Sequence, residues 1–231
     1  CSGLTSITIP ENVEAIEYLF PFQECTNLLS IQVAEHNRFY KSVDGILYDY
    51  SMDTLCVFPP GKGGEVSIPN QVKIIRAGAF YKCNNVTSVL FGDSITIIED
   101  KAFKGCLGLK GKLMFPITLK YIGSEAFYEC EGLDTVIIPD EVLKIYSYAF
   151  TSCSNVRSVV IGHSVKDIGE FAFGYCSNLE SLIIGESVEI IGDFAFKSLD
   201  KLKGHLNIPM KIRFIGIFAF ADCNNITSVK I

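Results

Sequence analysis

The feature that most constrains this chain is the pair Ala-Phe, which recurs at a nearly constant spacing. The spacings between successive phenylalanines are 23, 24, 23, 23, 23 and 24 residues, and the residues are Phe80, Phe103, Phe127, Phe150, Phe173, Phe196 and Phe220. A cysteine follows three residues after each of them, except after Phe196, where Leu199 takes its place. A fixed period of this length is typical of solenoids, in which no single unit can bury its apolar face without its neighbours.

Each unit also carries apolar residues at other fixed positions. After each cysteine an aliphatic pattern with a period of two ends at proline or glycine, as in the segment from Leu4 to Pro10, and this predicts a short strand stopped by a turn. Stacked units place such strands in parallel, about 4.8 Å apart. We therefore expect nine or ten coils of about 23 residues, stacked into a rod or shallow arc, with the Ala-Phe-x-x-Cys segment as a tight helical turn.

Taken together, the repeat CxxLxx[IV]x[IL][PG]xx[VL]xxIxxxAFxxC resembles the BspA-like leucine-rich repeats, the Treponema pallidum type, over nearly the whole chain. The resemblance implies a right-handed β/α superhelix, horseshoe-like but rich in strands, as a single leucine-rich-repeat domain over residues 1–231. It also implies a cell-surface or secreted protein of bacteria or protozoan parasites, with adhesion to host or matrix components as the expected role. Because the chain starts at Cys1 and ends at Ile231 within repeats, we expect it to be part of a longer array.

One segment departs from the period. Cys25 and Cys83 are 58 residues apart, and the surplus over two coils falls within residues 34–64. Two apolar stretches, 39–48 and 54–60, flank a polar one, which predicts a β-hairpin insert with its turn at residues 49–53. The segment is similar to the inserts that interrupt arrays in this family, and a structural role as a cap or brace is favoured over a ligand loop.

The composition of the chain and the spacing of its cysteines and histidines argue against catalysis and metal binding. A net charge of −6 with scattered Lys and Arg disfavours nucleic acid as a partner, and the chain has no apolar run of a length that would insert into a membrane. The cysteine column predicts buried free thiols, since Leu199 stands in it, and the exposure of Cys56, outside the column, is not predictable. No CxxC pair or Cys/His cluster suggests a metal site, and His36, His163 and His205 fall in different coils. We therefore expect no enzymatic activity, cofactor or metal.

Two glycosylation sequons begin at Asn85 and Asn225, at the same place in two coils. Asparagine is common at such turns for structural reasons. Chance is the favoured interpretation, and glycosylation the alternative.

The strands should present two outward columns, because alternate residues of a strand face the same side. One column is mostly small hydroxyls: Ser6, Ser30, Glu65, Ser88, Lys112, Thr135, Ser158, Ser181, His205 and Ser228. The other is Thr8, Gln32, Ser67, Leu90, Met114, Ile137, Val160, Ile183, Asn207 and Lys230. Five consecutive positions of the second column are apolar and form the candidate partner-binding site: Leu90, Met114, Ile137, Val160 and Ile183.

An exposed apolar stripe of this kind is typical of an interaction surface. Two alternatives remain open: β-branched residues suit any parallel sheet, and a second copy or another part of the protein could cover them. The sequence thus favours a cell-surface or secreted protein-binding module, with a protein or matrix ligand and possible glycan contacts, of unknown oligomeric state. The alternative function is a structural spacer that holds another domain away from the cell surface.

Overall fold

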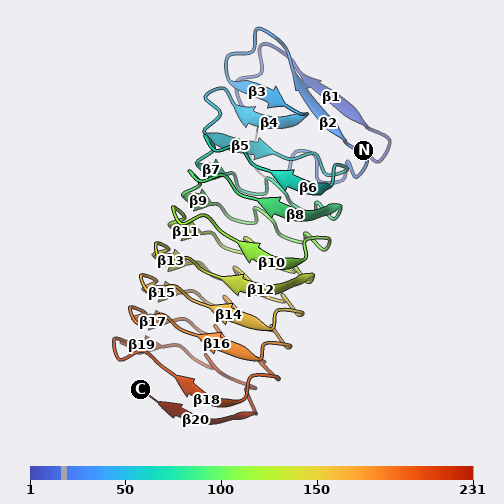
Figure 1. Ribbon diagram of the computed structural model, residues 1–231. Coiled ribbons are helices and arrows are strands. Elements are labelled where there is room, and N and C mark those ends of the chain that lie inside the picture. Colours follow the sequence, from blue (N-terminus) through green and yellow to red (C-terminus); the bar gives the residue numbers. More distant parts are fainter. Residues whose placement is uncertain (17–19, 231) are drawn as a thin grey trace.

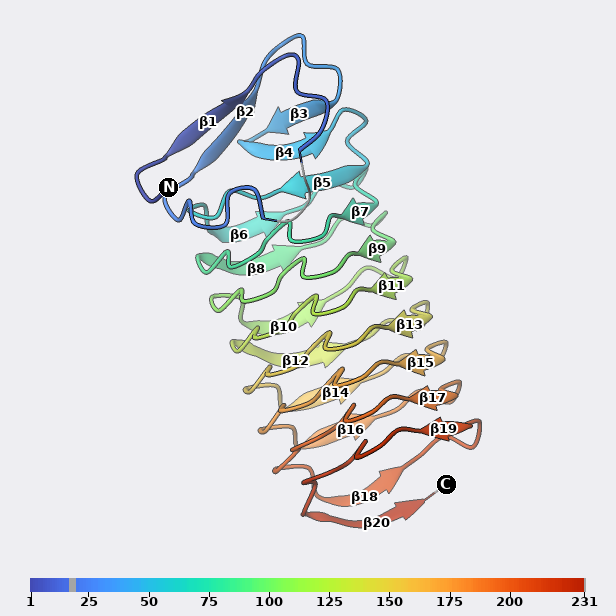
Figure 2. The same ribbon diagram turned by 180° about the vertical axis from the view of Figure 1, so that it is seen from behind.

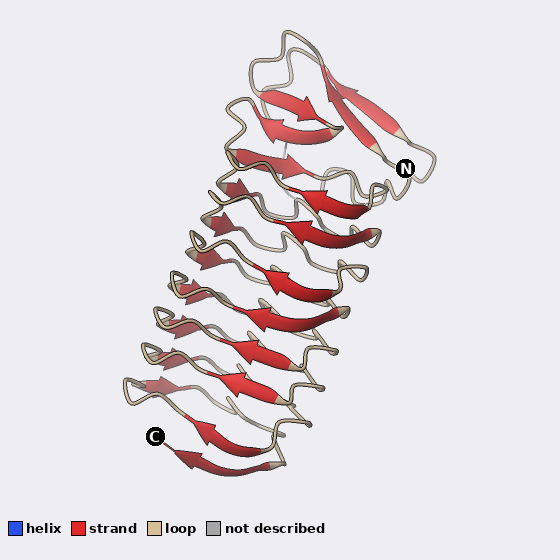
Figure 3. Cartoon of the chain, viewed as in Figure 1, coloured by secondary structure: helices blue, strands red, loops and turns tan. Residues whose placement is uncertain are grey.

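The computed structural model describes residues 1–16 and 20–230. They form an elongated solenoid in which the chain climbs from β1 and β2 at one end to β20 at the other (Figure 1). Over these residues the structure consists of strands and turns without a helix (Figure 3). The sequence predicts that the chain stops within a repeat at Ile231, and this residue lies outside the described ranges.

One side of the solenoid is a single ten-stranded sheet, seen from behind in Figure 2. Most of its strands are two residues long and end at the buried isoleucine that recurs in each coil. In spatial order from the N-terminal end they are β3 (Tyr40–Val43), β4 (Ile46–Asp49), β5 (Thr54–Val57), β7 (Ile74–Ile75), β9 (Ile97–Ile98), β11 (Tyr121–Ile122), β13 (Lys144–Ile145), β15 (Asp167–Ile168), β17 (Ile190–Ile191) and β19 (Phe214–Ile215).

The other side carries the longer strands that the sequence predicted after each cysteine. They pair in parallel, but in four separate sheets. These are β1 (Ser6–Ile9) with β2 (Ser30–Val33); β6 (Gly64–Ser67) with β8 (Val86–Leu90); β10 (Gly111–Met114), β12 (Leu133–Ile137), β14 (Ser158–Val160) and β16 (Ser181–Ile183); and β18 (Gly204–Asn207) with β20 (Ile226–Lys230).

The interruptions follow from three glycines. Gly64, Gly111 and Gly204 open β6, β10 and β18, each has a positive φ of 75 to 85°, and the pairing register shifts directly after each of them. Such φ values are easily reached only by glycine, and register shifts of this kind are β-bulges. Two of these glycines lie in the two 24-residue units, so the extra residue turns the strand away from the preceding coil.

The helical turn predicted for the Ala-Phe-x-x-Cys segment, and with it the β/α superhelix, is wrong. The Phe103 N–H donates to the carbonyl of Ala126 in the next coil (2.7 Å) instead of bonding within its own segment. Left-handed residues flank the phenylalanine on both sides, at Lys101 (φ 59°) and Gly105 (φ 71°). A helix cannot pass through such residues, so the segment is a chain of turns hydrogen-bonded to its neighbours.

The segment 34–64 contains three antiparallel strands, where the sequence suggested two. β4 and β5 flank residues 50–53, so the expected turn at 49–53 is confirmed except for Asp49, which ends β4. Residues 39–48 do not form one strand, because Asp44 and Gly45 (φ 51° and 75°) make a tight turn between β3 and β4. β4 lies between two apolar clusters. Tyr48 packs into the long core of the stack, and Leu47 packs into a smaller N-terminal cluster with Ile9 and Ile31.

The long core is organised around a ladder of phenylalanine rings. Successive rings from Phe58 to Phe220 lie 4.5 to 5.6 Å apart between centroids and are nearly parallel within the stack. Offset stacking of this kind stabilises each ring pair by about 1 kcal/mol beyond simple burial. The ladder connects each coil from Phe58 onward to the next through its centre, while the ten-stranded sheet connects the coils along one side.

Candidate functional site

The outward columns predicted from the sequence coincide with the strand register. Thr135 pairs with Ser158 and Ser158 with Ser181, while Ile137 pairs with Val160, which pairs with Ile183. Small hydroxyls and aliphatic side chains therefore run as two adjacent rows across β12, β14 and β16. The four-stranded sheet that carries these rows is the setting for the candidate site (Figure 1).

The five predicted apolar residues differ in exposure and do not form one continuous row. Leu90, Met114 and Ile183 are exposed by 53, 58 and 56 %. Ile137 and Val160 are less exposed and partly buried, because each has neighbouring strands on both sides. Leu90 belongs to β8, which is not paired with β10, so Gly111 and its bulge separate it from the other four.

The four connected residues, Met114, Ile137, Val160 and Ile183, line a groove of about 500 Å³. The groove continues from the strand ends over the following turns, where Ile117 lies 80 % exposed. Sequence reasoning missed Ile117. The sequence signal for Ile117 is its position directly after the Pro or Gly that ends each strand. That position is polar in several coils, as at Asp93 and Asp140, but is isoleucine here.

The polar residues at the rim of the groove are engaged in holding the turns. The Asp140 carboxylate accepts the His163 N–H at 2.9 Å, and Glu141 forms an ion pair with Lys120. These interactions fix the rim and leave the floor apolar. The site can therefore take up an apolar surface, and nothing in its lining resembles a nucleophile with an adjacent base.

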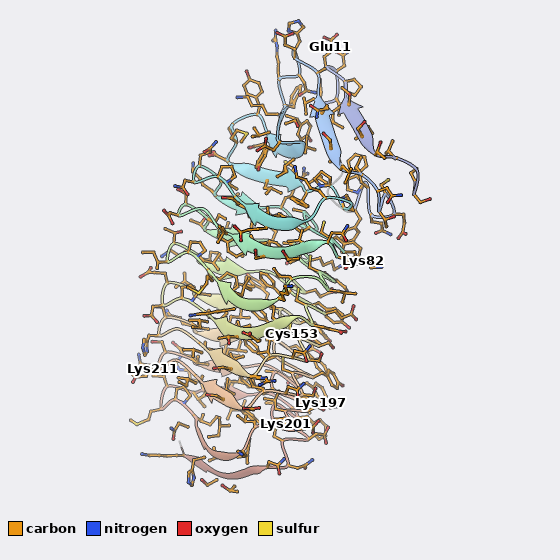
Figure 4. All side chains as sticks on the ribbon, turned by 45° about the vertical axis from the view of Figure 1, so that its right-hand side comes forward. Glu11, Lys82, Cys153, Lys197, Lys201 and Lys211 are labelled. Carbon is orange, nitrogen blue, oxygen red and sulfur yellow. The ribbon has the colours of Figure 1, made fainter. Side chains whose placement is uncertain are left out.

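Most of the cysteine column lies in the hydrophobic core. All nine cysteines are free thiols, and Cys153 lies inside the stack, while Lys82 and Lys197 lie on one edge and Lys211 on the opposite one (Figure 4). The prediction of buried free thiols is confirmed for Cys25 and for the column from Cys83 to Cys176, but Cys223 is only partly buried and Cys1 is exposed. The Cys153 thiol donates to the Phe127 carbonyl of the preceding coil (3.2 Å), and the same contact recurs along the column.

Burial also makes these thiols poor nucleophiles. Desolvation raises the pKa of Cys106 and Cys176 to about 12, and that of Cys153 well above its ordinary value. Cys56, whose exposure the sequence left open, is buried, and desolvation raises its pKa to about 11. A thiol that stays protonated at neutral pH cannot act as an activated nucleophile.

The asparagines of the two sequons have a structural role. Asn85 donates through its side chain to the Gly61 carbonyl at 3.1 Å, and Asn225 donates to the Asp200 carbonyl at 2.7 Å. Asn155 and Asn178 stand at the same place in other coils, outside any sequon, and make the same bond. The asparagine is thus explained by the turn that it ties to the preceding coil.

Metal-binding clusters and membrane-spanning helices are two features that would indicate the class of protein. Within residues 1–16 and 20–230, no group of three or more His, Cys, Asp or Glu side chains is arranged to hold a metal ion. In the same part of the chain, no helix has the length and apolar character needed to cross a membrane.

The sequence matches the family model described as the BspA type leucine rich repeat region, in six copies that cover residues 1–45, 62–131 and 110–227. No curated protein matches the chain. The internal unmatched stretch, residues 46–61, holds all of β4 and β5, so the family pattern is interrupted where the antiparallel strands occur.

Solved structures of bacterial leucine-rich-repeat proteins are similar over most of the chain. A leucine-rich repeat protein from Eubacterium ventriosum is 26 % identical, with a TM-score of 0.83, over 95 % of this chain and 59 % of its own. The Treponema pallidum leucine-rich repeat protein is 29 % identical, with a TM-score of 0.70, over 84 % of this chain and 90 % of its own. The pneumococcal vaccine antigen PcpA shares the fold, with 20 % identity and a TM-score of 0.69, over 99 % of this chain and 56 % of its own. The chain thus spans less than two thirds of the Eubacterium protein and of PcpA.

Proposed function

Because this chain belongs to the BspA-type leucine-rich-repeat family, we propose that it is a protein-binding module whose binding surface is the groove along β10, β12, β14 and β16. The observation that carries the proposal is the exposure of Met114, Ile117 and Ile183 around one apolar hollow. Contiguous apolar surface of this kind on a single chain marks a place where a partner docks.

Sheet propensity alone does not account for this surface. It explains β-branched residues within strands, such as Ile137, Val160 and Ile183. Met114 is not β-branched, and Ile117 lies in a turn, where an exposed isoleucine gains nothing from the sheet. Both side chains are explained if a partner covers them.

The proposal extends to location and ligand. The family supports a place at the cell surface or outside the cell, and an apolar groove with a fixed rim fits a protein ligand better than a glycan, whose hydroxyls need polar partners. We propose a host or matrix protein as the partner. The groove offers few aromatic or arginine anchors, so avidity from many copies on a surface would strengthen weak single contacts.

The test is binding of the purified chain to immobilised matrix proteins, with the double variant Met114→Lys/Ile183→Lys beside the wild type. These two side chains are more than half exposed, so the substitutions should leave thermal unfolding nearly unchanged while binding falls at least about tenfold. Ile137→Asp/Val160→Asp should also abolish binding, but these residues are partly buried, so its unfolding must be measured in parallel.

The matched control is Ser158→Lys/Ser181→Lys, which adds the same charge to β14 and β16 of the same sheet, in the neighbouring hydroxyl row. Loss of binding in the groove variant alone supports the proposal. Equal binding by all three proteins contradicts it, and a folded wild-type chain that binds none of the matrix proteins favours the spacer function instead.

A further inference from the structure

A second hollow lies at the ends of β9 and β11. These strands belong to the ten-stranded sheet, on the other side of the solenoid from the strands of the groove (Figures 1 and 2). It has a volume of about 410 Å³, and its lining includes Glu99, Asp100, Tyr121, Gly123 and Tyr146. Two carboxylates and two tyrosines thus meet around one opening that the repeat pattern does not require.

The hollow exists because one coil lacks a side chain that both neighbours possess. Ile98, Ile122 and Ile145 pair in register, so the residues directly after them, Glu99, Gly123 and Tyr146, form one column. Gly123 is glycine because a Cβ there would lie 2.6 Å from the Asp100 backbone nitrogen. Strands are about 4.8 Å apart, so the gap between the neighbours is the width of one inserted group.

The carboxylates at this gap are held in place. Asp100 Oδ1 accepts the Ser124 N–H at 2.7 Å, and Glu99 Oε2 accepts the Ala77 N–H at 2.9 Å. Each bond engages one oxygen and leaves the other available. Neither carboxylate forms an ion pair with a residue of the described ranges, although Arg76 lies in the adjoining hollow that Glu99 also lines. Asp100 is therefore the clearer negative charge.

The tyrosines supply surface that attracts a cation. Tyr121 and Tyr146 are each 38 % exposed. The Tyr146 ring already holds the Lys144 ammonium, 4.7 Å from its centroid, and this ammonium is neutralised by Asp167 at 2.7 Å, so Tyr121 is the ring offered to a cation from a partner. An aromatic ring attracts a cation through its negative face, and fixed carboxylates nearby add a charge-assisted hydrogen bond. Ile97 and Ala77 add apolar lining that suits an aliphatic stem.

From this geometry we propose that the hollow, here called the Gly123 slot, receives an arginine side chain from a protein partner. A guanidinium is flat enough for a gap one side chain wide, it stacks on aromatic rings, and its N–H groups match the two held carboxylates. A lysine would satisfy the charge without the stacking. A neutral sugar would leave both carboxylates without a counter-charge.

The probe is an acetylated and amidated pentapeptide, glycine-alanine-arginine-alanine-glycine, beside the same peptide with neutral citrulline in place of arginine. Binding is followed through the NMR methyl signals of Ile97 at low ionic strength. We expect the arginine peptide to shift these signals and the citrulline peptide to bind at least about tenfold more weakly. The variant Asp100→Asn retains the acceptor for the Ser124 N–H but loses the charge, and should weaken arginine binding by about the same factor.

The chain offers a matched control. Asp193 makes the same bond in another coil, to the Ile217 N–H at 2.7 Å, and is not part of the Gly123 slot, so Asp193→Asn should change nothing. Equal binding of the two peptides, equal loss in both variants, or shifts produced by glucose but not by arginine would each overturn the proposal. The groove variants leave this slot intact, so its failure and failure of the groove proposal are separately visible.

Discussion

At the scale of single residues, the repeating cysteine is explained by the hydrogen bond it makes. Each turn directs the phenylalanine carbonyl toward the interior, and the thiol of the next coil reaches it, as Cys130 reaches Phe103 at 3.2 Å. Cysteine is small enough for this fully buried position and is a weak donor. Leu199 shows that the site also accepts an apolar group, which is why the column could be predicted from the sequence as buried and free.

Thiol labelling tests this account. In the folded chain at pH 8, a chromogenic disulfide reagent should modify Cys1 rapidly and the partly buried Cys223 slowly, because the other seven thiols are buried. Burial also raises the pKa of the six thiols from Cys56 to Cys176, which keeps them protonated. In guanidinium chloride without reductant, all nine should react. A count below nine after unfolding would show that some of the thiols are paired as disulfides.

At the scale of elements, the strands could be predicted from the period, but the connections could not. The two-residue alternation before each Pro or Gly placed the strands of the groove correctly, because one-sided burial imposes that pattern. The Ala-Phe-x-x-Cys turn was misread as helical, because alternate N–H groups, such as that of Phe103, bond to the next coil and these bonds leave no local sequence pattern. Asp44-Gly45 between apolar residues is a strong turn signal that was overlooked, and it splits the expected hairpin into three strands.

The interruption of the groove sheet at Gly111 could also have been inferred, from the 24-residue spacing that contains it. Gly111→Ala isolates its backbone role, because an added Cβ would meet no atom within 4 Å and only the positive φ penalises alanine. We expect a loss of about 1 kcal/mol in the free energy of unfolding, measured with urea. Gly3→Ala also adds a Cβ in open space, but without a positive φ, and it serves as the control. Similar values for the two variants would mean that the bulge does not depend on glycine.

At the scale of the whole molecule, the solenoid has no centre on which all coils converge. From Phe58 onward the phenylalanine ladder and the ten-stranded sheet connect each coil to its neighbours, so stability is a sum of coil terms and nearest-neighbour terms. The groove and the Gly123 slot both arise where this regular stack is locally changed. In the one case Met114 and Ile117 replace residues that are polar in other coils. In the other, Glu99 and Tyr146 carry side chains on both sides of Gly123, where Gly169, Gly192 and Gly216 stand in later coils. The repeat explains the fold, and its exceptions mark the candidate sites.

Nearest-neighbour coupling can be measured with double-mutant cycles in the ladder. Phe127→Leu and Phe150→Leu remove rings that stack at 5.1 Å, whereas Phe127 and Phe196 are separated by the rings of Phe150 and Phe173. We expect urea unfolding to give a coupling energy of at least about 0.5 kcal/mol for the adjacent pair, and additive losses for the separated pair. Leucine keeps the sites apolar, so the variants should stay folded. Coupling as large in the separated pair would mean that the stack behaves as one cooperative core, and a substitution in the groove would then be felt at the Gly123 slot as well.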